Sequence, residues 1–262
     1  MLRSDARIIV VMPAFNAART LEACVAEVPA GWADEIILVD DASQDETVQL
    51  ARGLGLTVFR HNVNRGYGGN QKTCYREALA HGADVVVMVH PDHQYDPRII
   101  PQLVEPLLGG GADAVFGSRI LGGRTREGGM PRWKLVSNVA LTRIENAVLG
   151  IRLTEFHSGF RAYSRRYLEA VRFGENSDDF VFDSEIIAQG VLAGMRMREI
   201  PIATRYFPEA SQIGFRRSVV YGLGILRMLT RYVLHNFRIA RRTQFLPAAT
   251  AAAAGGTGPK LT

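Results

Sequence analysis

This chain of 262 residues has few cysteines, and it lacks long apolar runs and an apolar leader. Its two cysteines, Cys24 and Cys74, cannot build a disulfide framework, which favours a reducing compartment. No apolar run reaches the roughly 18 residues that a membrane-spanning helix needs. Residues 1–7 lack the apolar stretch of a signal peptide. The sequence therefore predicts a protein that stays in the cytoplasm.

Acidic residues are missing from one long segment. Between residues 213 and 242 there are seven arginines and no Asp or Glu, although the whole chain carries a net charge of only +5. Apolar residues such as Val219, Leu223 and Phe237 lie between these arginines. We therefore expect residues 211–242 to form basic amphipathic helices on an anionic lipid surface. The alternative is that the segment packs on the core and leaves its arginines in solvent.

The remaining composition is that of a globular protein. Hydrophobic residues make up 47% of the chain and charged residues 22%, which excludes disorder for most of it. Residues 243–262 are rich in Ala, Gly and Thr, and we expect them to form a disordered tail. A nucleic-acid partner is not expected, because the basic segment has few aromatic residues and no known nucleic-acid-binding module is present.

Apolar runs alternate with segments of helical spacing along most of the chain. The pattern predicts strands at 7–12, 35–39, 56–60, 85–89, 114–116, 156–163 and 196–202. It predicts helices at 17–27, 45–54, 70–80, 133–149 and 184–193, another helix beginning after Asp96, and a loop at 117–130. Such alternation is typical of an α/β fold with a mostly parallel, doubly wound sheet. Ligands of these sheets bind at the carboxyl ends of the strands.

Polar side chains follow two of the predicted strands. Asp40 and Asp41 end one strand, where they could accept hydrogen bonds from a nucleobase or a ribose. His90, Asp92 and Gln94 follow another strand, and together they could hold a divalent cation that also binds phosphates. The alternative for each group is a polar turn that hydrogen-bonds its own backbone.

Two further segments carry weaker signals. Residues 64–70 are rich in glycine and precede a predicted helix, so they could offer backbone N–H groups to a phosphate or form a plain loop. Asp183 and Glu185 begin another helix, two positions apart. Because this spacing points them in nearly opposite directions, we expect at most one of them to face a pocket and the other to be solvated.

Several short motifs in this order resemble those of the family-2 glycosyltransferases, within them the dolichol-phosphate mannose synthase-like branch. The resemblance runs from about Ile8 to Ile202. The matching segments are Val11-Met-Pro-Ala-Phe-Asn16, Val39-Asp-Asp-Ala-Ser43, Arg65-Gly-Tyr-Gly-Gly69, Ala114-Val-Phe-Gly-Ser-Arg119, Ser158-Gly-Phe-Arg-Ala-Tyr163 and Glu199-Ile-Pro-Ile202.

The resemblance implies a GT-A fold in one continuous domain over residues 1–210. Its nucleotide-binding part would cover about residues 1–105 and its acceptor-binding part about 106–210. The implied reaction transfers a sugar, with inversion, from a nucleotide-diphospho-sugar such as GDP-mannose or a UDP-hexose. By position in the motifs, the nucleotide-binding residues are Pro13, Ala14, Asn16, Asp40, Asp41 and Asp92.

The resemblance also implies a metal ion, Mg²⁺ or Mn²⁺, and an acceptor site. Asp92 and Gln94 match the metal and diphosphate ligands, and His90 stands where the family has the first Asp of its D-x-D motif. If the acceptor is a polyprenyl phosphate, its phosphate would be held by arginines. Arg119 is the main candidate, with Arg132 and Arg205 assisting. The expected catalytic residues are Asp92, Arg119 and, as the base for a hydroxyl acceptor, Asp183.

Alternatives remain open at this point. The chain could transfer sugar to a hydroxyl group in polysaccharide or glycoconjugate synthesis, or it could bind nucleotide-sugars with little catalysis, as His90 suggests. A lipid-phosphate acceptor and the basic segment together favour a peripheral position on the inner face of the membrane. The sugar, the nucleobase and the oligomeric state are left open by the sequence.

Overall fold

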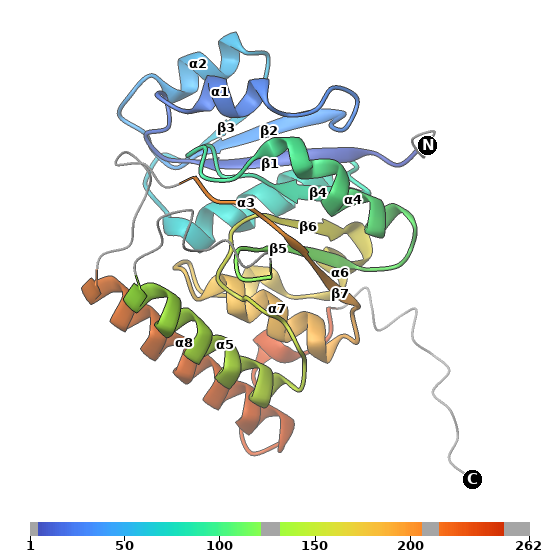
Figure 1. Cartoon of the computed structure of the whole chain (residues 1–262), viewed down its shortest axis with the longest axis vertical. Helices are drawn as coiled ribbons and strands as arrows, with labels where there is room; N and C mark the ends of the chain where they lie inside the picture. The colour runs from blue at the N-terminus through green and yellow to red at the C-terminus, as the bar shows by residue number, and fades with distance from the viewer. Residues whose placement is uncertain (1–4, 122–131, 206–214, 249–262) are drawn as a thin grey trace.

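A computed structural model of the chain describes residues 5–121, 132–205 and 215–248, and Figure 1 shows the arrangement of its elements. The strands are β1 (Ile8–Ala14), β2 (Glu35–Asp40), β3 (Thr57–Arg60), β4 (Val85–Met88), β5 (Ala114–Ser118), β6 (Arg161–Ser164) and β7 (Met197–Pro201). The α-helices are α1 (Leu21–Ala26), α2 (Thr47–Gly53), α3 (Gly66–Ala80), α4 (Ile100–Leu108), α5 (Arg132–Leu149), α6 (Arg165–Ala170), α7 (Phe182–Leu192) and α8 (Phe215–Asn236). Short 3₁₀ helices are η1 (Pro97–Ile99), η2 (Phe173–Glu175) and η3 (Thr243–Phe245).

The strands form one sheet in the order β3-β2-β1-β4-β6-β5-β7. Four of the strand pairings are parallel, and the two that involve β6 are antiparallel. The predicted α/β fold with a mostly parallel sheet is therefore confirmed. Strands β2 and β3 lie on one side of β1, and β4 and the later strands lie on the other side, so the strand order reverses between β1 and β4. The carboxyl ends of β1, β2 and β4 meet at this point, where ligands of such sheets bind.

Helices cover both faces of the sheet, which explains the continuous apolar runs of the central strands. In β1, Ile8 and Val10 pack on the face covered by α1, α2 and α4. Ile9 and Val11 pack on the opposite face, covered by α3, α6, α7 and α8. Because successive strand residues point to opposite faces, a strand buried on both sides must be apolar at every position.

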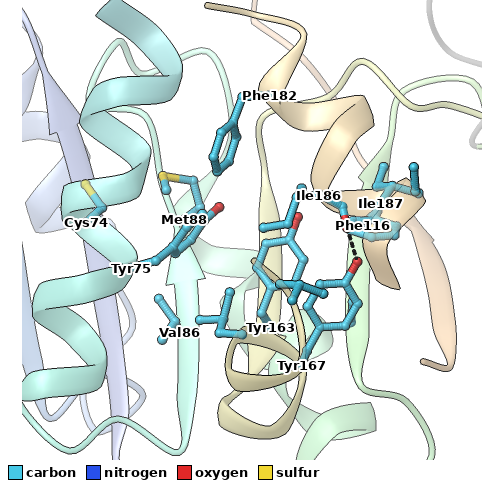
Figure 2. Packing of buried hydrophobic residues seen from close by; sticks show 14 of the residues in the cluster. Cys74, Tyr75, Val86, Met88, Phe116, Tyr163, Tyr167, Phe182, Ile186 and Ile187 are labelled. Carbon is cyan, nitrogen blue, oxygen red and sulfur yellow. Dashed lines mark hydrogen bonds between the residues drawn. The ribbon is translucent and has the colours of Figure 1, made fainter. Parts of the chain in front are cut away.

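The core on the second face is rich in aromatic side chains, as Figure 2 shows. Tyr75 of α3, Tyr163 of β6 and Tyr167 of α6 are all fully buried there. Their polar ends need partners, and the Tyr167 hydroxyl donates a hydrogen bond to the carbonyl oxygen of Ile186 at 2.9 Å. This contact joins α6 to α7.

Several predicted boundaries differ from the structure. The strand expected at 156–163 begins only at Arg161, and residues 155–160 run toward it as irregular chain. The tail expected at 243–262 is not disordered from its start, because Thr243–Phe245 form η3 with Gln244 and Phe245 buried. The Phe245 ring packs edge-on against Tyr232 of α8 at 5.8 Å, and this apolar contact orders the segment. Residues 249–262 lie outside the described part of the chain, as do residues 122–130 of the predicted loop.

The predicted basic amphipathic helices correspond, within the described residues, to the single helix α8. One face of α8 packs on the core through Ile225, Met228 and Leu229. The opposite face exposes apolar side chains, among them Val220 and Leu223 at 63% and 62% exposure. Helix α8 lies beside α5 along one side of the molecule (Figure 1). Among the described helices, none combines the length and apolar character needed to cross a membrane.

Candidate active site

A cavity of about 540 Å³ opens where the carboxyl ends of β1, β2 and β4 meet, and it extends to α5 and α8. Its lining at the strand ends includes the predicted residues Pro13, Ala14, Asn16, Asp41, His90, Asp92 and Gln94. Its lining toward the helices includes the predicted residues Arg119 and Asp183, together with Trp133, Ser137, Asn138, Leu141, His157, Ser218 and Tyr221. The structure thus brings together most of the residues that the sequence singled out, from segments far apart in the chain.

Asp40 and Asp41 do not act as a pair. The Asp40 side chain points away from the cavity lining, accepts a hydrogen bond from the backbone N–H of Ser43 at 3.1 Å and pairs with Arg60 at 3.4 Å. Asp41 lines the cavity, and its carboxylate lies 2.7 Å from Nδ1 of His61. The repulsion expected between adjacent carboxylates is relieved because the protein supplies each with different partners.

The glycine-rich segment is neither a phosphate cradle nor a plain loop, so both predictions for it are wrong. It forms the first turn of α3, four residues before the expected start at Asn70. The backbone N–H groups of Arg65 and Gly66 donate to the Asp41 carboxylate at 2.8 and 3.0 Å. Those of Gly68 and Gly69 donate to the carbonyl oxygen of Asp178 at 2.8 and 3.3 Å.

The glycines in this turn are explained by close packing. A Cβ atom at Gly66 would lie 2.7 Å from the carbonyl oxygen of Asp178, and one at Gly68 would overlap the carbonyl of Ser177. The segment 177–178 therefore lies directly against the start of α3, which only glycine permits. The amides that could have bound a ligand are used to fix Asp41 and this segment.

His90 stacks on an aromatic side chain that the sequence did not single out. Its ring lies nearly parallel to that of Tyr67, with the centroids 5.4 Å apart, and its Nε2 is 3.4 Å from the Tyr67 hydroxyl. Burial, and to a lesser extent the nearby Arg161 guanidinium, lowers the pKa of His90 to about 4. The imidazole is therefore neutral near pH 7 and brings no charge to the site.

Asp92 and Gln94 have the chemistry of a metal site. Both line the cavity, and the Gln94 backbone N–H donates to Asp92 at 3.1 Å, which fixes the carboxylate. Burial is the main cause that raises the pKa of Asp92 to about 6. A partly buried carboxylate and an amide side chain in one cavity lining suit Mg²⁺ or Mn²⁺, whose other ligands would come from a diphosphate. Within the described residues, no group of three acidic, His or Cys side chains forms a larger metal cluster.

Asp183 is held by three side chains. It accepts hydrogen bonds from the Tyr67 hydroxyl at 2.9 Å and the Gln71 amide at 3.2 Å, and it pairs with Arg161 at 3.4 Å. Burial raises the pKa of Asp183, and the Arg161 guanidinium opposes this effect. Of the two acidic residues, only Asp183 lines the cavity, as predicted. The other was expected to be solvated, and this is wrong, because Glu185 is buried and accepts a hydrogen bond from the backbone N–H of Ser177.

The three predicted phosphate-binding arginines have different positions. Arg119 lines the cavity but pairs with the buried carboxylate of Glu155 and donates to the carbonyl oxygen of His157 at 3.1 Å. Arg205 does not line the cavity and pairs with Glu27 at 3.0 Å, so the geometry does not support its predicted role. Arg132 begins α5, and its side chain lies outside the part of the chain that the structure describes.

A reason for the position of Arg205 lies in the backbone. Thr204 forms an isolated antiparallel bridge with Tyr95, and the backbone N–H of Arg205 donates to the carbonyl oxygen of Gln94 at 2.8 Å. This bridge places Arg205 beside the segment that contains Asp92 and Gln94, where its guanidinium pairs with Glu27 and Asp96. Arg205 also lies 2.7 Å from Nε2 of His93, so it contacts the segment between Asp92 and Gln94.

The helical end of the cavity contains polar residues that sequence reasoning missed. Nδ1 of His157 lies 2.8 Å from the hydroxyl of Tyr221, which α8 supplies. Nε2 of the same ring lies 3.4 Å from the carboxylate of Glu145, which is fully buried on α5. Tyr221 stands among arginines and apolar residues in the sequence, so no local pattern marked it.

Comparisons with known proteins agree with this geometry. Residues 9–172 match the family Glycosyl transferase family 2. An uncharacterized protein of Methanocaldococcus jannaschii is 31% identical over 84% of this chain and 89% of its own length. The UDP-N-acetylglucosamine–dolichyl-phosphate N-acetylglucosaminyltransferase of Methanococcus voltae is 27% identical over 86% of this chain and 98% of its own length.

Solved structures show the same fold. The glucosyl-3-phosphoglycerate synthase of Mycobacterium tuberculosis, crystallised with Mn²⁺, UDP and glucosyl-3-phosphoglycerate, has a TM-score of 0.64 and 22% identity. The likeness covers 87% of this chain and 80% of that chain. The predicted GT-A fold is thereby confirmed. By its motifs, its fold and its match over most of the sheet, the chain belongs to glycosyl transferase family 2 and is a glycosyltransferase.

Proposed function

We propose that this glycosyltransferase moves a sugar, with inversion, from a nucleotide-diphospho-sugar to a polyprenyl phosphate at a membrane surface. The observation that carries the proposal is the single cavity that joins the strand ends to α5 and α8. A nucleotide-sugar fits at the strand ends, beside Asn16, Asp41 and Asp92. A lipid phosphate fits at the other end, between two helices whose outer faces are apolar.

The relatives support the acceptor class. The Methanococcus voltae relative is named for transfer from a UDP-sugar to dolichyl phosphate, and it is covered almost completely by this chain. The donor of this chain is proposed more broadly as GDP-mannose or a UDP-hexose. Pro13, Ala14, Asn16 and Asp41 are the proposed nucleotide contacts, all of them in the cavity lining. Asp40, predicted with them, lies outside that lining and would act by ordering Ser43.

The proposed chemistry needs no strong base. A phosphate monoester is largely a dianion at neutral pH, so its oxygen can attack the sugar C1 without losing a proton first. The new C1–O bond forms as the bond from C1 to the diphosphate oxygen breaks, and the nucleoside diphosphate leaves. Arg119 would orient the acceptor phosphate, and Asp92 and Gln94 would hold a divalent metal that neutralises charge on the leaving diphosphate.

The membrane surface enters through α5 and α8. Trp133, Val136 and Ile144 of α5 and Val219, Val220, Leu223 and Leu226 of α8 are exposed apolar residues. The arginines of residues 213–242, with no acidic residue among them, favour anionic lipid over a protein partner of mixed charge. The proposed location is therefore the inner face of a membrane, reached by peripheral contact.

A transfer assay tests this function. The protein is incubated with a short-chain polyprenyl phosphate and each of GDP-mannose, UDP-glucose and UDP-N-acetylglucosamine, with Mn²⁺ or with a chelator. We expect one donor to yield a product that mild acid hydrolyses, and chelation to abolish its formation. Asp92→Asn should lower turnover by at least about 10²-fold, in line with the loss of one preorganised electrostatic contact to a developing charge.

Glu169→Gln is the matched control, because this carboxylate pairs with Arg165 on the surface and does not line the cavity. It should leave turnover unchanged. An acid-stable product formed only with hydroxyl acceptors would contradict the lipid-phosphate proposal and would make Asp183 the candidate base. Turnover only after His90→Asp would instead support a nucleotide-sugar-binding protein with little catalysis.

A further inference from the structure

Within the described part of the chain, one side chain brings positive charge to the acceptor end of the cavity. Among the described residues that line the cavity, Arg119 is the only Arg or Lys. Its guanidinium is already paired with the buried Glu155 carboxylate, so the charge it offers to a second anion is reduced. Other hydrogen-bond donors at the same end of the cavity would add to what Arg119 offers an anionic acceptor.

Tyr221 is placed to be such a donor. Its ring meets the ring of Phe180 edge-on at 6.4 Å, and both residues line the cavity. Behind its hydroxyl stand Nδ1 of His157 at 2.8 Å and, on the far side of that ring, the Glu145 carboxylate 3.4 Å from Nε2. The three side chains form a row from the cavity wall into the interior between α5 and α8.

The position of one proton in this row decides what Tyr221 offers to a ligand. If Glu145 is ionised, Nε2–H of His157 points to it, Nδ1 accepts from the tyrosine O–H, and lone pairs of the tyrosine oxygen face the cavity. If Glu145 is protonated, its O–H can donate to Nε2, Nδ1–H then donates to the tyrosine oxygen, and the tyrosine O–H is left to point into the cavity. Only the second arrangement favours an anion.

The inner end of the row has the features of the protonated form. Both oxygens of Glu145 and Nε2 of His157 are buried without a hydrogen-bond partner. A small side-chain movement would join Glu145 to Nε2 in either form, but the ionised form would leave a net negative charge buried with few donors, which is strongly destabilising. The two buried groups therefore favour the arrangement with no net charge.

We propose that the Tyr221 hydroxyl donates a hydrogen bond to the anionic group of the acceptor, and that Glu145 and His157 fix its direction. This inference rests on the proposed function, since it names a contact for the phosphate of that acceptor. Tyr221 touches the substrate, and His157 and Glu145 are positioning residues. Because Tyr221 belongs to α8, the helix with the exposed apolar face, the contact links lipid binding to the reaction centre.

The electrostatic surroundings support this assignment. Burial raises the pKa of Glu145 to about 8, against smaller opposing effects of Ser184 on α7 and Arg161 on β6. Burial, with help from the Arg119 and Arg161 guanidinium groups, lowers the pKa of His157 to about 3. Both shifts keep the pair uncharged near pH 7.

Steady-state kinetics with varied acceptor and varied donor test the inference. For Tyr221→Phe we expect the acceptor KM to rise about tenfold or more, as for a lost hydrogen bond to a charged group, with the donor KM unchanged. Glu145→Gln should keep the acceptor KM within about threefold of wild type, because its amide N–H replaces the carboxylic O–H as donor to His157. Glu145→Leu, which has no donor, should raise it.

Tyr232→Phe is the matched control, since this tyrosine lies on the core side of the same helix and outside the cavity lining. It should leave both KM values unchanged. Two results would overturn the inference and leave the proposed function intact, provided that the wild type transfers sugar to polyprenyl phosphate. One is an unchanged acceptor KM in Tyr221→Phe, and the other is an acceptor KM that rises as much in Glu145→Gln as in Glu145→Leu. Absence of any transfer by the wild type to polyprenyl phosphate would overturn the proposed function and this inference with it.

Discussion

Single acidic residues around the cavity differ in how fully the protein satisfies them. Asp41 accepts two backbone N–H donors and faces His61, so its carboxylate is fixed before any ligand arrives. Glu145 has no hydrogen-bond partner at either oxygen and is fully buried. A carboxylate with several donors is stabilised as an anion, whereas one without donors in the interior holds its proton. The two carboxylates therefore differ in their partners, and Glu145, which lies behind the cavity lining, is the one that burial keeps protonated.

This difference predicts a pH dependence of stability. The pKa of Glu145 rises from its ordinary value of 4.5 to about 8 in the folded state, so between these limits the unfolded chain has released the proton that the folded chain keeps. The free energy of unfolding then falls as the pH rises, by at most about 1.4 kcal/mol per pH unit. Glu145→Gln removes this contribution, and its stability relative to wild type should increase across the same window.

Urea unfolding at about pH 5, about pH 6.5 and about pH 8 measures this difference. His157 and all other titrating groups are present in both proteins, so their contributions largely cancel in the comparison. Parallel stability curves for wild type and Glu145→Gln would show that Glu145 is ionised in the folded state. That result would also contradict the proton arrangement inferred for Tyr221.

Helix α7 packs closely against a neighbouring side chain at a glycine, where a Cβ atom has no room. At Gly190 in α7 a Cβ would overlap the phenol ring of Tyr167, the side chain that also bonds the Ile186 carbonyl (Figure 2). At Gly53, the last residue of α2, a Cβ would meet nothing within 4 Å. The close contact at Gly190 sets how near α7 lies to α6, and α7 in turn carries Asp183.

Replacing glycine by alanine should therefore have opposite effects on the free energy of unfolding at these two positions. Gly190→Ala should lower the free energy of unfolding by about 1–3 kcal/mol, because the core must shift to admit the methyl group. Gly53→Ala should raise it by roughly 0.5–1 kcal/mol, because alanine restricts the unfolded chain and fits the helix. Denaturant unfolding of both variants checks this. Equal effects of the two substitutions would mean that helix propensity alone, and not packing, sets the change in stability at Gly190.

At the scale of the molecule, many of the exposed apolar residues in the described part of the chain gather on one pair of helices. Helices α5 and α8 lie together (Figure 1), and α8 uses one face for the core and keeps a second apolar face outside. A helix that only packed on the core would gain nothing from that second face. The arrangement supports the proposed contact with anionic lipid, in which the apolar residues enter the interface and the arginines meet the head groups.

Vesicle binding tests this surface. Val220→Ser together with Leu223→Ser should weaken binding to vesicles that contain phosphatidylglycerol by roughly tenfold or more, since each apolar side chain contributes a fraction of its transfer free energy. Added salt should weaken the wild type as well. Val63→Ser is the control, because Val63 is equally exposed at 67% on the loop before α3. Equal binding of all three proteins in co-sedimentation would rule out this face as the lipid contact.

Periodicity and motifs within the sequence were sufficient for the architecture and the family. The apolar runs of β1 and β4 predict buried strands, because only side chains that tolerate burial on both faces can occupy them. The placement of Asp41, Asp92 and Gln94 at strand ends follows directly from that pattern. These features depend on residues close together in the chain, so the sequence by itself determined them.

Tertiary structure decided how the polar groups are paired. The amides at the start of α3 donate to Asp41 and to the Asp178 carbonyl, and Arg205 pairs with Glu27. Tyr221 of α8 contacts His157, although no motif includes this tyrosine. Each of these pairings joins residues distant in sequence, and a buried polar group takes whichever partner packing brings within reach. Local spacing cannot encode that choice, since it depends on how the helices close over the sheet.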